Sequence, residues 1–210
     1  GRLRPHVKTH KCRETTLLMM EAGITQFKCA TIAEAEMLGM CQAPDVLLAY
    51  QPGGPKLQRL MAVMQQFPAT QYGCLVDNKQ SALKMSEAFV SAGWQIPVYI
   101  DLNVGMNRTG MVPGPEALAL YSFCHSLPGL RMLGLHAYDG HIRQPAYQEK
   151  LAACHKAFEG VTSLQQAIVK TGLPSPNIII GGSPGFSVHC HREQVVCSPG
   201  TFVYWDYTYS

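Results

Sequence analysis

Lys8 is the residue whose type and position are most suggestive of chemistry. It ends the short segment 5–8, Pro-His-Val-Lys, which we predict to be the first strand, near the core. Burial at a strand end disfavours the ammonium form of a lysine and lowers its pKa. The neutral amine that results is the form needed for Schiff-base chemistry with a carbonyl compound. A solvated lysine at a strand end is the alternative interpretation.

Two loops of small residues follow the last two predicted strands. The first, 181–185, is Gly-Gly-Ser-Pro-Gly, and the second, 198–201, is Ser-Pro-Gly-Thr. Such loops expose backbone N–H groups, and a helix that starts there adds a positive dipole end, so together they bind phosphate well. Barrels of alternating strands and helices often bind phosphate after strands seven and eight. Each loop alone is also compatible with an ordinary glycine turn.

Arg108 and Tyr138 are two further candidates near strand ends. Arg108 lies between Gly105 and Gly110, which allow a tight loop to fold back over the strands. A fixed guanidinium there suits an anionic or phenolic oxygen, although a surface arginine in a helix-capping turn is equally compatible. Tyr138 shares a strand face with His136 and could stack on a planar ring, or simply fill the core.

These residues need a scaffold in which several strand ends meet. Short β-rich runs alternate with helical patterns, and Thr31 with Glu34 forms a capping box at one helix start. The predicted strands are 5–8, 26–29, 45–49, 72–76, 98–103, 131–136, 177–180 and 194–197. The predicted helices are 13–22, 31–40, 55–66, 78–92, 114–126, 146–171 and 184–191. Eight such units predict an α/β fold, a closed (β/α)8 barrel of TIM type, with an open doubly wound sheet as the alternative.

In a (β/α)8 barrel the ligand site lies at the carboxyl ends of the strands. Polar and glycine residues follow most of the predicted strands and form one candidate set. Its members are Lys8, His10, Asn103, Arg108, Tyr138, His141, Gly181, Gly182, Ser183, Ser198, Gly200 and Thr201.

The composition narrows the class of protein. The 210 residues carry a formal net charge of +3 with no run of Lys or Arg, so nucleic acid is not an expected partner. No apolar run reaches membrane-spanning length, so we expect no membrane partner. Eight cysteines without a CxxC pair predict buried thiols in a cytoplasmic protein. His189, Cys190 and His191 are adjacent and should point to different sides, which makes them a poor metal chelate.

The segment 4–11, Arg-Pro-His-Val-Lys-Thr-His-Lys, resembles the cofactor-lysine motif of the D-threonine aldolase and D-serine dehydratase family. These fold-type III pyridoxal-phosphate enzymes share their N-terminal barrel with alanine racemase. The similarity extends over nearly the whole chain. It includes 30–35, 45–50, 101–110, 134–142, 181–186 and 198–206.

The resemblance implies a cofactor and a role for each candidate. Pyridoxal 5'-phosphate would be bound covalently to Lys8, with Arg108 near its phenolic oxygen and Tyr138 against its ring. The resemblance assigns its phosphate to four residues of the two small-residue loops: Gly182, Ser183, Gly200 and Thr201.

Two positions depart from the racemase pattern. Ser198 stands where racemases have an arginine that contacts the pyridine nitrogen, and Cys12 stands where they have a tyrosine. Both differences favour the aldolase and dehydratase branch over a plain alanine racemase. The resemblance therefore implies a lyase of D-β-hydroxy amino acids, a D-threonine aldolase that yields glycine and an aldehyde. The alternatives are a D-serine dehydratase and, from a different class, a non-catalytic pyridoxal-phosphate-binding homeostasis protein.

The resemblance also implies parts outside this chain. The barrel is expected over 1–203, and 204–210 would begin a C-terminal β region that the chain lacks. That region would supply the ligands of a divalent metal, Mn or Zn, so no metal ligand is assigned here. The intact enzyme is expected to be a homodimer.

Overall fold

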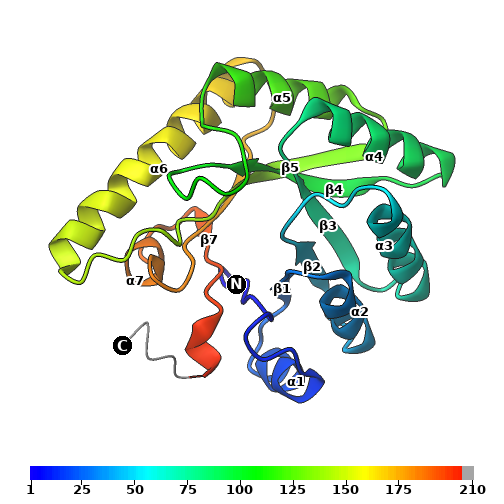
Figure 1. Cartoon of the computed structure of the whole chain (residues 1–210), viewed down its shortest axis with the longest axis horizontal. Coiled ribbons are helices and arrows are strands. Elements are labelled where there is room, and N and C mark those ends of the chain that lie inside the picture. The colour runs from blue at the N-terminus through cyan, green and yellow to red at the C-terminus, as the bar shows by residue number, and fades with distance from the viewer. Residues whose placement is uncertain (205–210) are drawn as a thin grey trace.

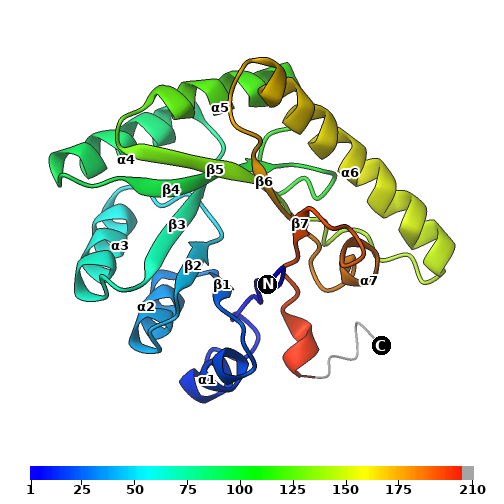
Figure 2. The same ribbon diagram turned by 180° about the vertical axis from the view of Figure 1, so that it is seen from behind.

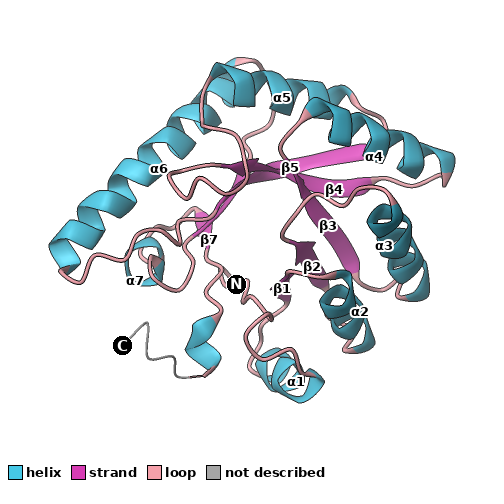
Figure 3. Cartoon of the chain, viewed as in Figure 1, coloured by secondary structure: helices cyan, strands magenta, loops and turns pink. Residues whose placement is uncertain are grey.

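The computed structural model describes residues 1–204, which form a curled, entirely parallel β-sheet with helices on its outer face (Figures 1 and 3). Its strands are β1 (Gln26–Cys29), β2 (Asp45–Leu48), β3 (Gln71–Val76), β4 (Ile96–Leu102), β5 (Leu130–Ala137), β6 (Asn177–Ile180) and β7 (Val195–Val196). Each strand pairs with the next one along the chain, in the order β1 to β7. A doubly wound sheet reverses its strand order, so the open alternative is excluded.

A helix connects each strand to its parallel neighbour, as parallel pairing requires. The helices are α1 (Arg13–Glu21), α2 (Ile32–Met40), α3 (Pro55–Gln66), α4 (Lys79–Ser91), α5 (Pro115–Ser126), α6 (Tyr147–Lys170) and α7 (Phe186–His189). A short 3-10 helix, η1 (Thr201–Val203), follows β7. The predicted cap of α2 is confirmed, because Thr31 Oγ1 accepts a hydrogen bond from Glu34 N at 3.1 Å.

The first predicted strand, 5–8, is not a regular strand, and this is the main correction to the sequence analysis. The N-terminal segment instead forms two isolated parallel bridges, Leu3 with Cys197 and His6 with Lys28. Pro5 lacks the N–H that a continuous ladder needs, but its carbonyl still accepts from Lys28 N at 2.8 Å. The segment thereby lies between β7 and β1 and closes the barrel (Figure 2, where N marks its start).

Several predicted boundaries were also wrong near the C-terminus. β7 has two residues where 194–197 was expected, and α7 covers Phe186–His189 where 184–191 was expected. The helix α7 begins two residues later than predicted, because Pro184 and Gly185 favour the turn that precedes it. Of the expected C-terminal region, 204–210, only Tyr204 lies within the described residues. No described helix has the length and apolar character needed to cross a bilayer.

The barrel interior is filled by side chains below the strand ends. Leu47, Leu75, Tyr99 and Ile179 form a separate inner cluster, each at most 6% exposed. They alternate along their strands with residues that pack outward against the helices. Because these apolar side chains fill the barrel interior, a polar site has room at the carboxyl ends of the strands.

A buried ion pair holds the N-terminal segment in the barrel. Arg4 is 2% exposed, and its Nη1 and Nη2 donate to the two Asp45 oxygens at 2.8 Å and 2.7 Å. Nη1 also reaches the Phe27 carbonyl at 3.3 Å. The fork of donors connects the start of the chain to β1 and β2, the first two regular strands.

We expect Arg4→Ala to lower the free energy of unfolding by about 3 kcal/mol, because it leaves Asp45 and the Phe27 carbonyl without their partner. Urea unfolding followed by circular dichroism measures the change. Arg13→Ala, at an exposed arginine in the first turn of α1, is the matched control and should change stability little. Equal effects of the two substitutions would contradict the proposed role of the ion pair.

Candidate functional site

A cavity of about 340 Å³ opens at the carboxyl ends of the strands. It is where the barrel fold predicts a ligand site. Its lining includes three of the predicted residues, Lys8, Arg108 and Tyr138. It also includes polar residues to which the sequence analysis gave no separate role: His6, Lys28, Asp101 and His136.

Three cationic side chains surround the ring of Tyr138. Lys8 Nζ lies 5.7 Å from the ring centroid, Lys28 Nζ 5.9 Å and Arg108 Cζ 5.0 Å. Each distance is within the range of a cation–π contact. One carboxylate, that of Asp101, lines the same cavity. The cavity therefore suits an anionic ligand with a planar ring.

Lys8 lies exposed at the mouth of this cavity, less buried than the sequence predicts. Partial burial of its amine and the nearby Arg108 guanidinium lower its pKa from the ordinary 10.5, although Glu34 opposes this. Since deprotonation of the amine becomes easier, Lys8 has the character expected of a Schiff-base nucleophile.

Lys28 is a second amine, deeper in the cavity and 3% exposed. Burial and the charge of Lys8 lower its pKa to about 7. Nothing in the sequence marks it as functional except its type, a lysine inside the otherwise largely apolar run 26–29. Its strand position points it into the barrel, because the neighbouring Phe27 and Cys29 pack outward in the main core.

A hydrogen-bonded pair, Asp101 and His136, joins the ends of β4 and β5. Asp101 Oδ1 lies 2.8 Å from His136 Nδ1, and Thr109 Oγ1 donates to Oδ2 at 2.8 Å. Burial raises the pKa of Asp101, but these bonds outweigh it and the net pKa is lowered. Burial lowers the pKa of His136. A neutral His136 donates from Nδ1 to the carboxylate, which leaves Nε2 as a proton acceptor at the cavity.

The two small-residue loops meet beside this cavity. Ser183 Oγ accepts hydrogen bonds from Gly200 N and Thr201 N, each at 3.0 Å. Two backbone N–H groups that converge on one oxygen also fit an oxygen of a phosphate group. A Cβ at Gly200 would lie 3.2 Å from the His6 carbonyl oxygen, a tight contact that the small glycine avoids. The structure thus brings together three of the four predicted phosphate residues.

Gly182, the fourth, is buried and points its N–H elsewhere. It donates to Asp139 Oδ1 at 2.9 Å, on the inner side of the loop. Asp139 is 0% exposed, and no pattern in the sequence identified it as a partner of this loop. Only its position, in the segment 134–142 that follows a predicted strand, could have drawn attention to it.

Other members of the candidate set lie outside the cavity lining. His10 is buried with Nε2 3.1 Å from Thr16 Oγ1, and Asn103 is bound to Asn107 in its own loop. Ser198 is 4% exposed, and its Oγ has no hydrogen-bond partner among residues 1–204. His189 is buried whereas His191 is exposed, so these two histidines do not converge.

Comparisons with known proteins agree with this architecture. Residues 1–208 match the family model described as "Alanine racemase, N-terminal domain". A D-threonine aldolase of Arthrobacter sp is 30% identical over 182 residues, covering 86% of this chain and 48% of that protein. The D-threo-3-hydroxyaspartate dehydratase of Delftia sp. (strain HT23) is 25% identical over 215 residues, covering 98% of this chain and 54% of that protein.

A solved structure gives the same result for the fold. The crystal structure of D-threonine aldolase from Filomicrobium marinum superposes with a TM-score of 0.91 at 28% identity, covering 99% of this chain and 56% of that one. The predicted barrel and the resemblance to the D-threonine aldolase and D-serine dehydratase family are therefore confirmed. The chain spans about half the length of the curated relatives it matches.

We expect Lys28→Met to stabilise the protein at neutral pH. Lys28 has a pKa of about 7 in the folded state against 10.5 in the unfolded chain, so folding releases its proton between these values. The resulting cost is greatest below pH 7 and vanishes above pH 10.5. At ~1.4 kcal/mol per pKa unit, its removal should add on the order of a few kcal/mol at pH 7.

Urea unfolding of wild type and Lys28→Met at pH 7 and pH 10.5 measures this difference. The exposed α4 residue Lys84, changed to Met, is the control and should show no such pH dependence. A stability difference that grows with pH would contradict a lowered pKa for the buried Lys28.

Proposed function

Because the chain belongs to the family of alanine racemase N-terminal domains, we propose that it is the pyridoxal-phosphate-binding barrel of a lyase. The substrates we propose are D-β-hydroxy amino acids, and the reaction is the D-threonine aldolase type of cleavage. The observation that supports this most directly is the position of Lys8. Its amine, with a lowered pKa, lies at the mouth of a cationic cavity next to the Ser183, Gly200 and Thr201 cradle.

The side chains of the cavity have chemically distinct functions in this proposal. Lys8 would hold the cofactor aldehyde until the substrate amine displaces it; in the dehydratase alternative the released amine would also be the base at the substrate Cα. Arg108 neutralises a phenolic oxygen, and Tyr138 packs against a planar ring. The backbone of the 198–201 loop and Ser183 hold the phosphate. Pyridoxal phosphate, when bound, supplies the ring that delocalises a carbanion at Cα.

Two residues not identified from the sequence extend this set. His136 lines the same cavity as Lys8, and Asp101 keeps its imidazole oriented through Nδ1. Such an oriented neutral imidazole is suited to take up a proton, such as that of a substrate hydroxyl. We therefore add His136 as a candidate base and Asp101 as its positioning residue.

The relatives favour the aldolase over the dehydratase only by a small difference in sequence identity. The D-threonine aldolase is 30% identical, against 25% for the hydroxyaspartate dehydratase. Dehydration, with Lys8 taking the Cα proton and hydroxide leaving from Cβ, is the second candidate. A non-catalytic pyridoxal-phosphate-binding protein is the candidate of another class, and absence of turnover in the whole protein would favour it.

The proposal extends to a whole protein of about twice this length. The barrel would be 1–203, followed by a C-terminal β region, and the intact enzyme would be a homodimer. A divalent metal, Mn or Zn, would polarise the substrate hydroxyl from ligands in that region. Within residues 1–204, the one group of three metal-type side chains is the buried Asp139, Cys154 and His189, outside the cavity lining.

We expect pyridoxal phosphate to turn the chain yellow and borohydride to fix the colour on Lys8. Peptide mapping by mass spectrometry identifies the labelled lysine. Lys28 is the most informative competitor, because its amine also lines the cavity and has a pKa of about 7. Label on Lys28 or Lys11, or retained label in Lys8→Ala, would contradict the assignment.

We also expect the 210 residues alone to cleave D-threonine poorly, even though they bind the cofactor. Without the Lewis acid the substrate hydroxyl loses several kcal/mol of transition-state stabilisation, roughly a thousandfold in rate. The assay measures glycine formation from D-threonine and L-threonine with and without Mn²⁺. Full metal-stimulated activity would show that the metal ligands lie within this chain. Equal rates on both enantiomers would contradict the proposed stereochemistry.

A further inference from the structure

Asp139 is completely buried and lies against two residues of the 181–185 loop, Gly182 and Gly185. Its Oδ1 accepts the Gly182 N–H at 2.9 Å. A Cβ built on Gly185 would lie 2.1 Å from Oδ2, and one built on Gly182 would lie 3.6 Å from Oδ1. The loop therefore packs against this carboxylate, and the absence of a Cβ at Gly185 makes the approach sterically possible.

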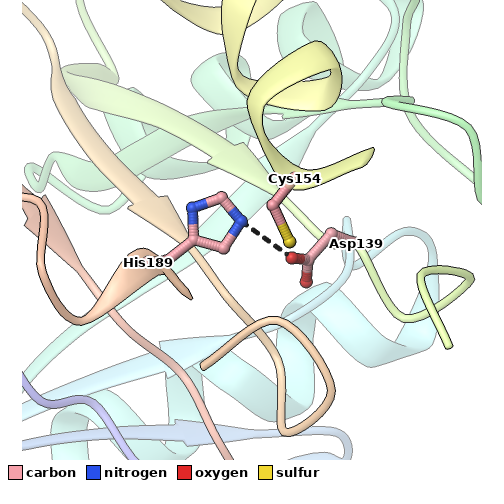
Figure 4. Close-up of side chains that lie close together, drawn as sticks. All are labelled: Asp139, Cys154 and His189. Atoms are coloured by element: carbon pink, nitrogen blue, oxygen red, sulfur yellow. Dashed lines mark ion pairs between the residues drawn. The ribbon is translucent and has the colours of Figure 1, made fainter. Parts of the chain in front are cut away.

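His189, the last residue of α7, holds the other side of the Asp139 carboxylate (Figure 4). Its Nε2 is 3.0 Å from Oδ2, and both residues are 0% exposed. The two atoms are within ion-pair distance, but neither has a hydrogen-bond partner among the described residues. His189 also supports the loop directly, since a Cβ on Gly181 would lie 3.0 Å from the His189 Cβ.

Arg192 fixes the protonation of the His189 ring. Its Nε donates to His189 Nδ1 at 3.2 Å, and a guanidinium has no acceptor. Nδ1 must therefore be the unprotonated nitrogen, so the ring proton is on Nε2, the nitrogen that lies 3.0 Å from Asp139 Oδ2. The contacts form one chain, from Arg192 through His189 and Asp139 to the Gly182 N–H.

The same geometry argues against a metal ion at this place. Cys154 completes a group with Asp139 and His189 whose ligand atoms lie within 4.8 Å of one another. A metal would need Nε2 unprotonated, whereas the Arg192 donor places the proton there. Burial also raises the pKa of the Cys154 thiol to about 11, so a thiolate is disfavoured.

We propose that Asp139 and His189 are positioning residues of the phosphate site, and that the Arg192–His189–Asp139 chain holds the 181–185 loop in its binding shape. The loop presents Ser183 to the N–H groups of Gly200 and Thr201, so its shape sets how these groups meet a phosphate. The inference rests on the proposed function, because the phosphate is that of pyridoxal phosphate.

The test compares two ligands that differ only in the phosphate, pyridoxal phosphate and pyridoxal, by titration followed by absorbance. We expect His189→Leu to weaken pyridoxal phosphate binding about tenfold, the equivalent of ~1.4 kcal/mol, and to leave pyridoxal binding unchanged. His189→Gln keeps a donor near the Nε2 position and should restore most of the affinity. Cys154→Ala is the matched control in the same cluster and should bind both ligands as wild type does.

Asp139→Asn provides a second test if His189→Leu fails to fold. Asn can still accept the Gly182 N–H but no longer faces His189 with a charge, so we expect the same selective loss. The ¹⁵N NMR shifts of His189 in the wild type should show the proton on Nε2.

Equal loss of both ligands in folded variants, or no loss of either, would overturn the positioning role. Stoichiometric Zn²⁺ that disappears in Cys154→Ala would overturn it too. If the wild type binds neither ligand, the proposed function fails together with this inference, whereas wild-type binding with unselective variants rejects the inference alone.

Discussion

The structure depends on the hydrogen bonds that hold the N-terminal segment between β7 and β1. Val7 N donates to the Lys28 carbonyl, Lys28 N to the Pro5 carbonyl, and Arg4 N to the Cys197 carbonyl, each at 2.8 Å. These bonds close the barrel with very little regular strand. They also fix the backbone directly before Lys8, so the proposed cofactor lysine is placed by the same contacts that complete the sheet.

The barrel could be predicted from the sequence because its strands and helices alternate with distinct periodicities and clear caps. Strands β1 to β6 and helices α1 to α6 lie where they were expected, within a few residues. The first strand was predicted as regular because the residues 5–8 alone do not reveal that the segment makes only two isolated bridges, with Pro5 lacking an N–H for the ladder. The short α7 was overestimated for a related reason, since only tertiary contacts decide where a turn becomes a helix.

Only part of the site could be predicted from the sequence, because its residues occupy two kinds of position relative to the strands. Lys8, Arg108 and Tyr138 follow strands directly, and the barrel fold alone brings such residues to one end. Lys28, Asp101 and His136 are each the second-to-last residue of a strand, so a pattern of polar residues that follow the strands does not include them. Their contacts join different strands, so no local pattern could reveal that Asp101 and His136 form a pair.

The charges of the cavity show why an anionic ligand fits the fold. Lys8, Lys28 and Arg108 surround one ring, and among the cavity-lining residues Asp101 alone opposes them with a carboxylate. The protein limits their repulsion by lowering the pKa of both lysines, so that at least one amine is readily neutral. An incoming anion reverses this effect, because a nearby negative charge stabilises the ammonium form of Lys28. Binding of such an anion and uptake of a proton by Lys28 would therefore be coupled, and Lys8 would remain the amine for the proposed covalent chemistry.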